Sequence, residues 1–359
     1  MKTKDKILKY LKEKKSASGR ELSQSFGISR QATNKHLKEL ILNGNVVKEG
    51  TTKGVIYRSS LAGRKIQSVQ RFRKICSLQG LEEDKIFKEV ELLLNLRKNL
   101  KKNVFEIIHY TFTEILNNAL EHSRSTKCYI ETTLDQYKCN FRIRDYGIGI
   151  FYSIFTKFNL SDETSAIGEL IKGKTTTMKE KHSGEGVFFT SKSGDAIAFR
   201  SHKINLIFDN LKRDVFVEER KLVKGTEVNF SMSRNSKRKL KAIFEQFAPR
   251  EFGYRFEKTK AFVKLFQKEC ISRSEAKRLL LNLDKFKEII LDFKGVKSIG
   301  QGFADEIFRV FRKEYPDTII GTENVNPTLK PIIKRAVDNN GDFPENFARS
   351  GIGTTVKDK

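Results

Sequence analysis

The feature that most constrains this 359-residue chain is a series of short polar motifs that follow one another along its middle part. A predicted helix carries Glu114 and Asn118, which are four residues apart and therefore project from one helix face. A predicted pair of strands follows and ends in a D-x-G-x-G motif at residues 145–149. A G-x-G motif at residues 184–186 precedes another helix, and a Gly-Thr pair at residues 225–226 lies on a later strand. Each motif is common by itself, so the information is in their order and spacing.

This order of motifs resembles that of the GHKL superfamily, which includes gyrase, heat-shock chaperones, histidine kinases and mismatch-repair ATPases. The resemblance spans residues 95–235 and implies an α/β two-layer sandwich, the Bergerat ATP-binding fold, over residues 82–235. It also implies that this domain takes ATP and Mg²⁺ as cofactors. The site residues that the resemblance implies are Glu114, Asn118, Asp145, Gly147, Gly149, Lys174, Gly184, Gly186 and Thr226.

The resemblance gives the polar residues of this set separate roles. Asn118 supplies a side-chain oxygen to Mg²⁺, which bridges phosphate oxygens and keeps several waters. Asp145 accepts a hydrogen bond from the adenine amino group, and Thr226 supports the base from the final strand. If Glu114 follows the hydrolytic members, it orients or deprotonates the attacking water.

The glycines and one lysine complete the implied site. Gly147 and Gly149 allow a tight backbone turn beside the base. Gly184 and Gly186 free backbone N–H groups at a helix N-terminus for the phosphates. Lys174 lies where the superfamily has a mobile lid. Two interpretations of Lys174 stay open: its side chain contacts the γ-phosphate, or it is a solvent-exposed lysine of a loop.

Residues 1–60 follow the order helix, helix, turn, helix, β-hairpin. Ser18 is placed to cap the second helix, with Glu21 three residues later in a capping-box arrangement. Gly27 ends that helix, and Ser29 caps the third one. The segment after the third helix alternates apolar and polar residues around a Gly-Thr-Thr-Lys-Gly turn, which predicts a hairpin.

This segment resembles a winged helix-turn-helix over its whole length. The resemblance implies that the third helix enters the major groove of DNA and that the hairpin, or wing, contacts phosphate. The residues expected to face DNA are Arg30, Gln31, Asn34, Lys35 and Lys38 on the helix, and Lys53 and Arg58 on the wing. A winged helix that serves only as a protein-docking module is the alternative.

The net charge of the chain indicates a polyanionic partner. Its 70 Lys and Arg residues exceed its 44 Asp and Glu residues by 26. Residues 1–75 hold 19 basic and five acidic residues, so the excess is concentrated where the DNA-binding pattern occurs. A generally basic surface without a nucleic-acid partner is the alternative explanation.

The remaining composition limits the class of protein. A hydrophobic fraction of 38% and a charged fraction of 32% are typical of a folded globular chain. No stretch approaches the ~20 apolar residues of a membrane helix, and the charged start is unlike a secretory signal. The four cysteines are far apart, which predicts reduced thiols and no zinc site. We therefore expect a cytoplasmic protein without a membrane partner.

The last third of the chain alternates strand, turn, helix, strand and helix. Residues 289–293 predict a buried strand, and a Gly-Gln-Gly turn at residues 300–302 leads into a helix. This pattern resembles a STAS domain, the βαβα fold of anti-anti-sigma factors, and we assign it to residues 236–340. The turn has no hydroxyl where those factors carry their phosphate-accepting serine. A βαβα tail that only completes the fold is the alternative.

These observations predict a multidomain α/β protein. Its expected parts are a winged helix at residues 1–60, a linker at 61–81, an ATP-binding domain at 82–235, a STAS-like domain at 236–340 and a flexible tail at 341–359.

The expected function is that of an ATP-binding transcriptional regulator. Its partners are double-stranded DNA and ATP or ADP, with a homodimer and a protein partner of the STAS-like domain as further candidates. Two alternatives stay open, each with its own enzymatic activity. One is a serine/threonine protein kinase in a partner-switching system, similar to anti-sigma-factor kinases. The other is an ATP-driven DNA clamp or defence ATPase.

Overall fold

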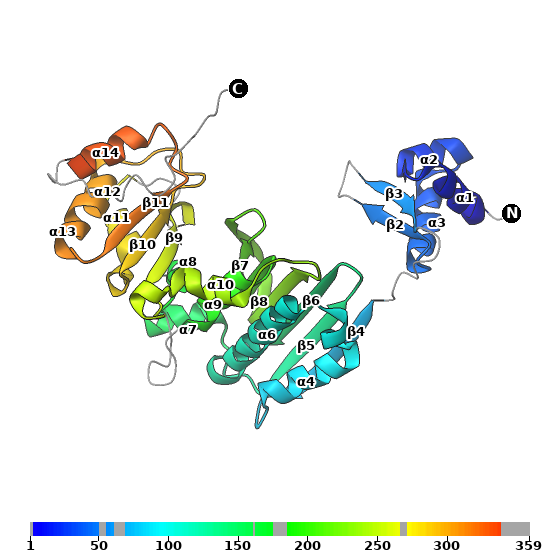
Figure 1. Ribbon diagram of the computed structural model, residues 1–359, viewed down its shortest axis with the longest axis horizontal. Helices are drawn as coiled ribbons and strands as arrows, with labels where there is room; N and C mark the ends of the chain where they lie inside the picture. The colour runs from blue at the N-terminus through cyan, green and yellow to red at the C-terminus, as the bar shows by residue number, and fades with distance from the viewer. Residues whose placement is uncertain are drawn as a thin grey trace. The chain divides into compact units, whose positions relative to one another are not determined.

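The computed structural model of the protein describes residues 3–49, 55–60, 69–160, 162–174, 185–265 and 271–338 (Figure 1). The chain forms two compact units, one of residues 1–70 and 134–136 and the other of residues 71–133 and 137–359. None of the helices in these ranges is long and apolar enough to cross a membrane.

The first unit contains three helices and a small three-stranded sheet in the order β1-β3-β2. Strand β3 pairs antiparallel with both of its neighbours. Its elements are α1 (Thr3–Lys14), β1 (Ala17–Ser18), α2 (Gly19–Phe26), α3 (Arg30–Leu42), β2 (Val46–Glu49) and β3 (Ile56–Ser59). Apart from the two-residue strand β1, this order of elements is the one that the sequence predicts.

The helix ends of this unit follow from single residues. Ser18 Oγ accepts a hydrogen bond from the backbone N–H of Glu21 at 3.1 Å, and Ser29 Oγ accepts one from the N–H of Ala32 at 3.1 Å. Gly27 ends α2 in the left-handed conformation with φ 59°. Only half of the expected capping box forms, because the Glu21 carboxylate accepts hydrogen bonds from two side chains of α1 instead.

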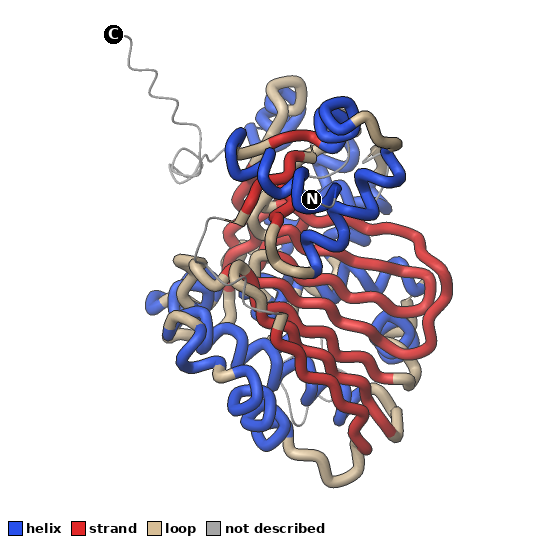
Figure 2. Tube along the Cα trace, turned by 90° about the vertical axis from the view of Figure 1, so that its right-hand side faces the viewer, coloured by secondary structure: helices blue, strands red, loops and turns tan. Residues whose placement is uncertain are grey.

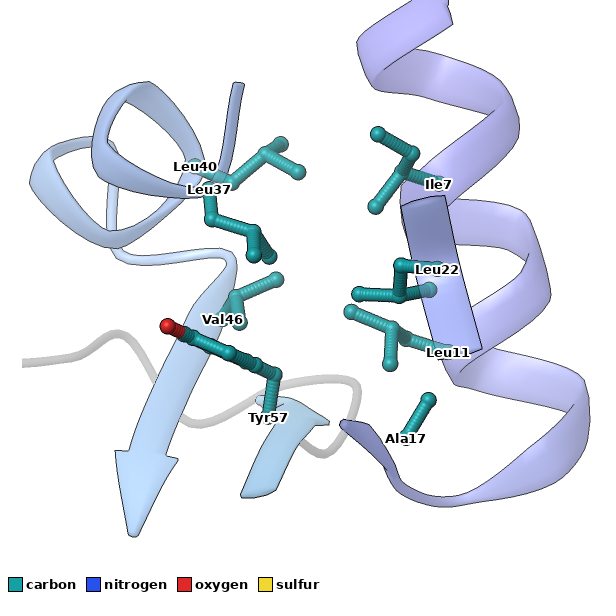
Figure 3. Close-up of a cluster of buried hydrophobic side chains, with 8 residues drawn as sticks. All are labelled: Ile7, Leu11, Ala17, Leu22, Leu37, Leu40, Val46 and Tyr57. Carbon is teal, nitrogen blue, oxygen red and sulfur yellow. The ribbon is translucent and has the colours of Figure 1, made fainter. Parts of the chain in front are cut away.

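One hydrophobic cluster holds the three helices against the sheet (Figure 3). Figure 3 shows side chains from α1, α2 and α3 pointing toward those of the strands. Its fully or nearly buried members are Ile7, Leu11, Ala17, Leu22, Leu37, Leu40, Val46 and Tyr57. Burial of these apolar side chains leaves the opposite side of α3 free for polar residues.

The larger unit begins with a five-stranded sheet in the order β4-β5-β6-β8-β7. Strand β8 pairs antiparallel with β6 and with β7. The strands are β4 (Gln70–Ser77), β5 (Lys127–Leu134), β6 (Lys138–Asp145), β7 (Ala196–Asp209) and β8 (Asp214–Ser233), and Figure 2 shows them as neighbouring red bands.

Helices cover one face of this sheet. They are α4 (Glu83–Leu94), α5 (Leu96–Asn99), α6 (Lys102–His122), α7 (Ile150–Lys157), α8 (Glu163–Lys172), α9 (Gly186–Ser193) and α10 (Leu240–Phe247). Helix α6 packs on β6 and β8, and α4 packs on α6 (Figure 1). Phe112 of α6 meets Phe141 of β6 with ring centroids 5.4 Å apart, and Phe141 stacks on Phe230 of β8 at 4.7 Å.

Two predicted boundaries of this domain are wrong. Residues 61–81 do not form a linker throughout, because residues 70–77 form β4, in which buried Phe72 and Cys76 face the helices. The domain also continues beyond residue 235, because α10 packs on α6 and α9. The ring centroids of Phe244 and Phe189 are 4.5 Å apart.

The C-terminal part of this unit is a parallel sheet in the order β11-β10-β9 with helices packed on it. Its main elements are β9 (Lys258–Phe262), α11 (Arg273–Leu280), β10 (Glu288–Asp292), α12 (Gln301–Asp305), α13 (Arg312–Glu314), β11 (Ile319–Glu323) and α14 (Lys330–Asp338). A π-helical segment, Glu306–Phe311, joins α12 to α13. Strand β9 was not expected from the sequence, and the predicted tail at residues 341–359 lies outside the described residues.

Helix α8 connects the two sheets of the larger unit. Lys172, at its last position, is buried and donates hydrogen bonds to Glu169 at 2.8 Å and to the carbonyl of Leu281 at 2.7 Å. Asn282 donates to the second carboxylate oxygen of Glu169 at 2.8 Å, and Thr259 donates to the Lys172 carbonyl at 2.5 Å. The end of α8 is therefore bonded to the STAS-like part of the chain.

Candidate functional site

A pocket of about 310 Å³ opens at the end of β6 and beside the middle of β8, between α6, α7 and α9. Six of the residues predicted to bind nucleotide line it together: Glu114, Asn118, Asp145, Gly149, Gly186 and Thr226. Apolar side chains from the surrounding helices and strands form much of the wall, among them Ile115, Ile143, Ile150, Ile154, Phe189 and Phe199. A mostly apolar hollow with a few convergent polar groups is typical of a small-molecule site.

Asp145 is held in a fixed position at the wall of the pocket. Its side chain is 5% exposed, and Oδ1 accepts hydrogen bonds from the backbone N–H groups of Gly147 at 2.9 Å and Thr226 at 3.1 Å. Burial raises the pKa of this carboxyl, and the two backbone hydrogen bonds oppose the increase. Gly147 itself is not among the lining residues, but its N–H orients the carboxylate.

The turn after β6 requires glycine at position 149. Gly149 has φ 86°, and an added Cβ there would lie 2.3 Å from the Ser201 hydroxyl oxygen. Directly after it, the N–H of Ile150 donates to Thr226 Oγ1 at 2.9 Å. This bond ties the start of α7 to β8, and the first turn of α7 therefore forms one side of the pocket.

Glu114 lies against the first residue of α9. A Cβ on Gly186 would be only 2.1 Å from Oε2 of Glu114, so a larger residue at this position would displace the carboxylate. Tyr110 lies one helical turn earlier on α6, and its pKa is raised by burial and by the charges of Glu114 and Glu185. The last glycine of the G-x-G motif and the carboxylate of Glu114 are thus neighbours in space.

Asn118 brings an amide group into the pocket. Its Nδ2 atom is buried, and no hydrogen-bond partner for it occurs among the described residues. An unpartnered buried donor costs free energy, so this position fits a group that is completed by a ligand. The described ranges contain no cluster of three His, Cys, Asp or Glu side chains that could hold a metal ion by themselves.

The remaining predicted nucleotide ligands are not part of this pocket in the described structure. Lys174 donates to Glu257 at 3.0 Å and to the carbonyl of Lys285 at 2.6 Å, and it lies over the ring of Phe286. Its ammonium group is therefore bonded to the STAS-like part of the chain. Gly184 lies outside the described residues.

On the winged helix, the residues predicted to face DNA lie on one exposed side of α3. Arg30, Gln31, Asn34, Lys35 and Lys38 are all exposed. On the wing, Arg58 is exposed and pairs with Glu49 at 3.2 Å, and Lys53 lies outside the described residues.

Several lining residues of the pocket were not found from the sequence. Tyr110, Ser153 and Phe244 belong to segments without a recognisable motif, and Glu185 is the middle residue of the G-x-G motif, of which only the glycines were predicted to bind. Helical spacing was a usable signal for Tyr110, which precedes Glu114 by four residues on α6. No such signal existed for Phe244, because α10 reaches the pocket only through tertiary packing.

Comparison with known protein families gives two matches. Residues 2–46 match a winged helix-turn-helix DNA-binding family, and residues 275–332 match a STAS-like domain of unknown function. The chain thus has a winged helix at its N-terminus and a STAS-like domain near its C-terminus, and the former indicates a DNA-binding regulator. No curated protein and no solved structure matches this chain.

Proposed function

We propose that the protein is a transcriptional regulator in which a GHKL-type domain binds ATP or ADP with Mg²⁺ and controls DNA binding by the winged helix. The observation that carries the proposal is the assembly of the predicted residues in one pocket. Glu114, Asn118, Asp145, Gly186 and Thr226 come from four separate elements and nevertheless line the same hollow.

Asp145 supports recognition of adenine. Its carboxylate is fixed by two backbone N–H groups at the pocket wall, and apolar residues surround it. Such an acceptor fits the exocyclic amino group of adenine, whereas guanine presents a carbonyl oxygen at the corresponding position. Two acceptors facing each other in a buried site are unfavourable. The pocket should therefore select adenine over guanine.

The opposite side of the pocket supports binding of the phosphates. Gly186 is the first residue of α9, where unpaired backbone N–H groups and the helix dipole favour an anion. Asn118 would hold Mg²⁺ through its side-chain oxygen, with phosphate and water oxygens as the other ligands. When bound, Mg²⁺ would supply positive charge to the phosphates. Glu114 lies against Gly186 and is placed to orient a water.

Helix α9 supports communication between the pocket and the STAS-like domain. It begins at the pocket with Gly186, and near its other end the Lys192 ammonium lies 5.4 Å from the ring centroid of Phe262 in β9. If the ligand binds more tightly to one position of α9 than to another, its binding would also change the contact of α9 with the STAS-like domain. A difference in ligand affinity between two states of this kind is what a population shift requires.

Calorimetric titration of the full chain with Mg-ATP, Mg-ADP and Mg-GTP tests the nucleotide proposal. Asp145→Asn should weaken ATP binding by about 1–3 kcal/mol, because a charge-assisted hydrogen bond in a buried site is lost. Asp317→Asn, an exposed change in the STAS-like domain with the same loss of charge, is the control and should leave binding unchanged. Equal affinity for ATP and GTP in the unchanged protein would refute adenine recognition.

A further inference from the structure

The five-stranded sheet has a second face, opposite to the face covered by α4 and α6 (Figure 1). Successive residues of a strand point to opposite faces of the sheet, so the residues on either side of each buried core residue point outward. The charged side chains at the outward positions of β4, β5 and β6 and of the paired segments 196–201 of β7 and 226–233 of β8, here called the basic sheet face, are Arg71, Arg73, Lys127, Lys138, Arg142, Arg144 and Arg200, with Glu131 and Glu227. Beyond the irregularity at His202, which lies outside this surface as defined, the outward positions of β7 and β8 carry Asp209, Asp214, Glu218 and Arg220. Seven basic and two acidic residues give this face a strong positive charge.

The contacts across the strands show that these side chains form one surface. Glu131 of β5 pairs with Arg73 of β4 at 2.7 Å and with Arg142 of β6 at 2.6 Å, while Arg71 lies 3.4 Å from the same carboxylate. Three guanidinium groups therefore surround one carboxylate. The single negative charge of Glu131 aligns the arginines but neutralises only one of them.

The composition of this face differs from that of the rest of the chain. Arginine accounts for 23 of the 70 basic residues of the protein, but for five of the seven on the basic sheet face. Arginine binds phosphate through two parallel N–H groups, whereas lysine acts as a point charge. A lysine-rich chain that places arginines on one flat surface is suited to bind phosphate groups there.

Three of these arginines have hydrogen-bonding capacity that is not used within the protein. The Nε atoms of Arg142, Arg144 and Arg200 are buried beside the sheet and have no hydrogen-bond partner among the described residues. Atoms enclosed in this way are also out of reach of a phosphate oxygen, so a phosphate contact would use the terminal N–H groups of these arginines.

The aromatic residues at this face decide between double-stranded and single-stranded nucleic acid. Arg142 lies over the ring of Tyr129 at 5.3 Å, and Arg144 and Lys127 lie over the ring of Tyr146 at 4.9 and 5.5 Å. Cations thus occupy ring faces on which unpaired bases would stack. The surface favours contact with a phosphate backbone over contact with exposed bases.

We propose that the basic sheet face is a second DNA-binding surface, which contacts the phosphate backbone of double-stranded DNA independently of base sequence. This surface would act in addition to the winged helix, whose α3 would supply sequence recognition. DNA binding by the basic sheet face does not depend on nucleotide binding in the pocket. DNA binding by the full chain would then combine two electrostatic contacts, one in each compact unit.

The test uses the full chain and a fluorescently labelled duplex of arbitrary sequence, with affinity measured over a series of NaCl concentrations. The variant Arg71→Ala/Arg73→Ala/Lys127→Ala removes three exposed charges from the basic sheet face. Each lost phosphate contact should reduce the slope of log affinity against log salt by about 0.9, so we expect a slope that is smaller by about 2 to 3. The matched control Lys98→Ala/Lys101→Ala/Lys102→Ala removes three exposed charges from the helix-covered side and should leave the slope unchanged.

The same comparison is made in an Arg30→Ala background, in which DNA binding by the winged helix is weakened. The sheet-face variant should reduce the slope of log affinity against log salt there by the same amount as in the unchanged protein. An unchanged slope in the sheet-face variant, or an equal reduction in the control, would overturn the proposal. Tighter binding of a single strand than of the duplex, lost in the same variant, would overturn the assignment to double-stranded DNA.

Discussion

Lys192 is a basic residue held in apolar surroundings on α9. Its ammonium lies 5.1, 5.2 and 5.4 Å from the ring centroids of Phe188, Phe208 and Phe262. Burial lowers its pKa to about 7, with a contribution from the charge of Lys260, while Asp292 acts in the opposite direction. The charge of this one side chain therefore changes near neutral pH.

The sign of the resulting pH dependence follows from linkage. Below about pH 7 Lys192 is protonated in the folded and in the unfolded chain, whereas between about pH 7 and 10 only the unfolded chain keeps the proton. The contribution of Lys192 to the free energy of unfolding should therefore rise with pH across this range. Urea denaturation at about pH 6 and about pH 9 should show a larger rise for the unchanged protein than for Lys192→Met. The same rise in both proteins would show that folding does not lower the pKa of Lys192.

At the scale of elements, α3 should read DNA sequence and the wing should not. Arg30→Ala or Gln31→Ala should reduce discrimination between a selected site and a scrambled duplex by about 1–3 kcal/mol, because side chains that contact base edges are lost. Arg58→Ala should weaken binding to both duplexes alike, since a phosphate contact carries no sequence information. Competition binding with the two duplexes measures both effects. Equal losses on both duplexes for the α3 variants would contradict sequence reading by α3, and unchanged binding of both duplexes would favour the docking-module alternative.

The end of α8 should depend on its buried ion pair. Lys172→Met leaves the carboxylate of Glu169 buried without its cation, which should lower the free energy of unfolding by about 3–5 kcal/mol. Lys172→Met/Glu169→Gln removes both charges and should recover most of that loss. Urea denaturation of the single and double variants measures the coupling. If the two variants are equally destabilised, the pair contributes through packing and not through charge.

How far the sequence predicts the structure also differs between elements. The caps at Ser18 and Ser29 and the turn at Gly149 are local, because one side chain or one backbone angle determines each of them. Strand β4 was missed because its outward positions are arginines, which made it resemble a basic linker. Helix α10 was assigned to the wrong domain, because its apolar face shows that it packs but not against which partner. Lys174 is bonded to Glu257, an arrangement that residue spacing does not encode.

The whole molecule combines a winged helix, a pocket that we propose binds nucleotide, and a STAS-like domain. The domain that contains the pocket lies in one compact unit with the STAS-like domain, and α8 and α9 of that domain each contact it. The ion pair at the end of α8 is bonded to Leu281 and Asn282, and α9 extends from the pocket to Phe262. The account therefore assigns the nucleotide a regulatory role toward DNA binding, in addition to any hydrolysis.

The most direct test of this central claim is the affinity of the full chain for its selected duplex, measured at constant salt with and without saturating Mg-ATP. We predict that Mg-ATP changes this affinity by about 5-fold or more, the size of a typical coupling free energy of 1–3 kcal/mol. The change should be absent in Asp145→Asn and retained in Asp317→Asn. An affinity that is the same with and without Mg-ATP, at concentrations where calorimetry shows the nucleotide to be bound, would contradict the account.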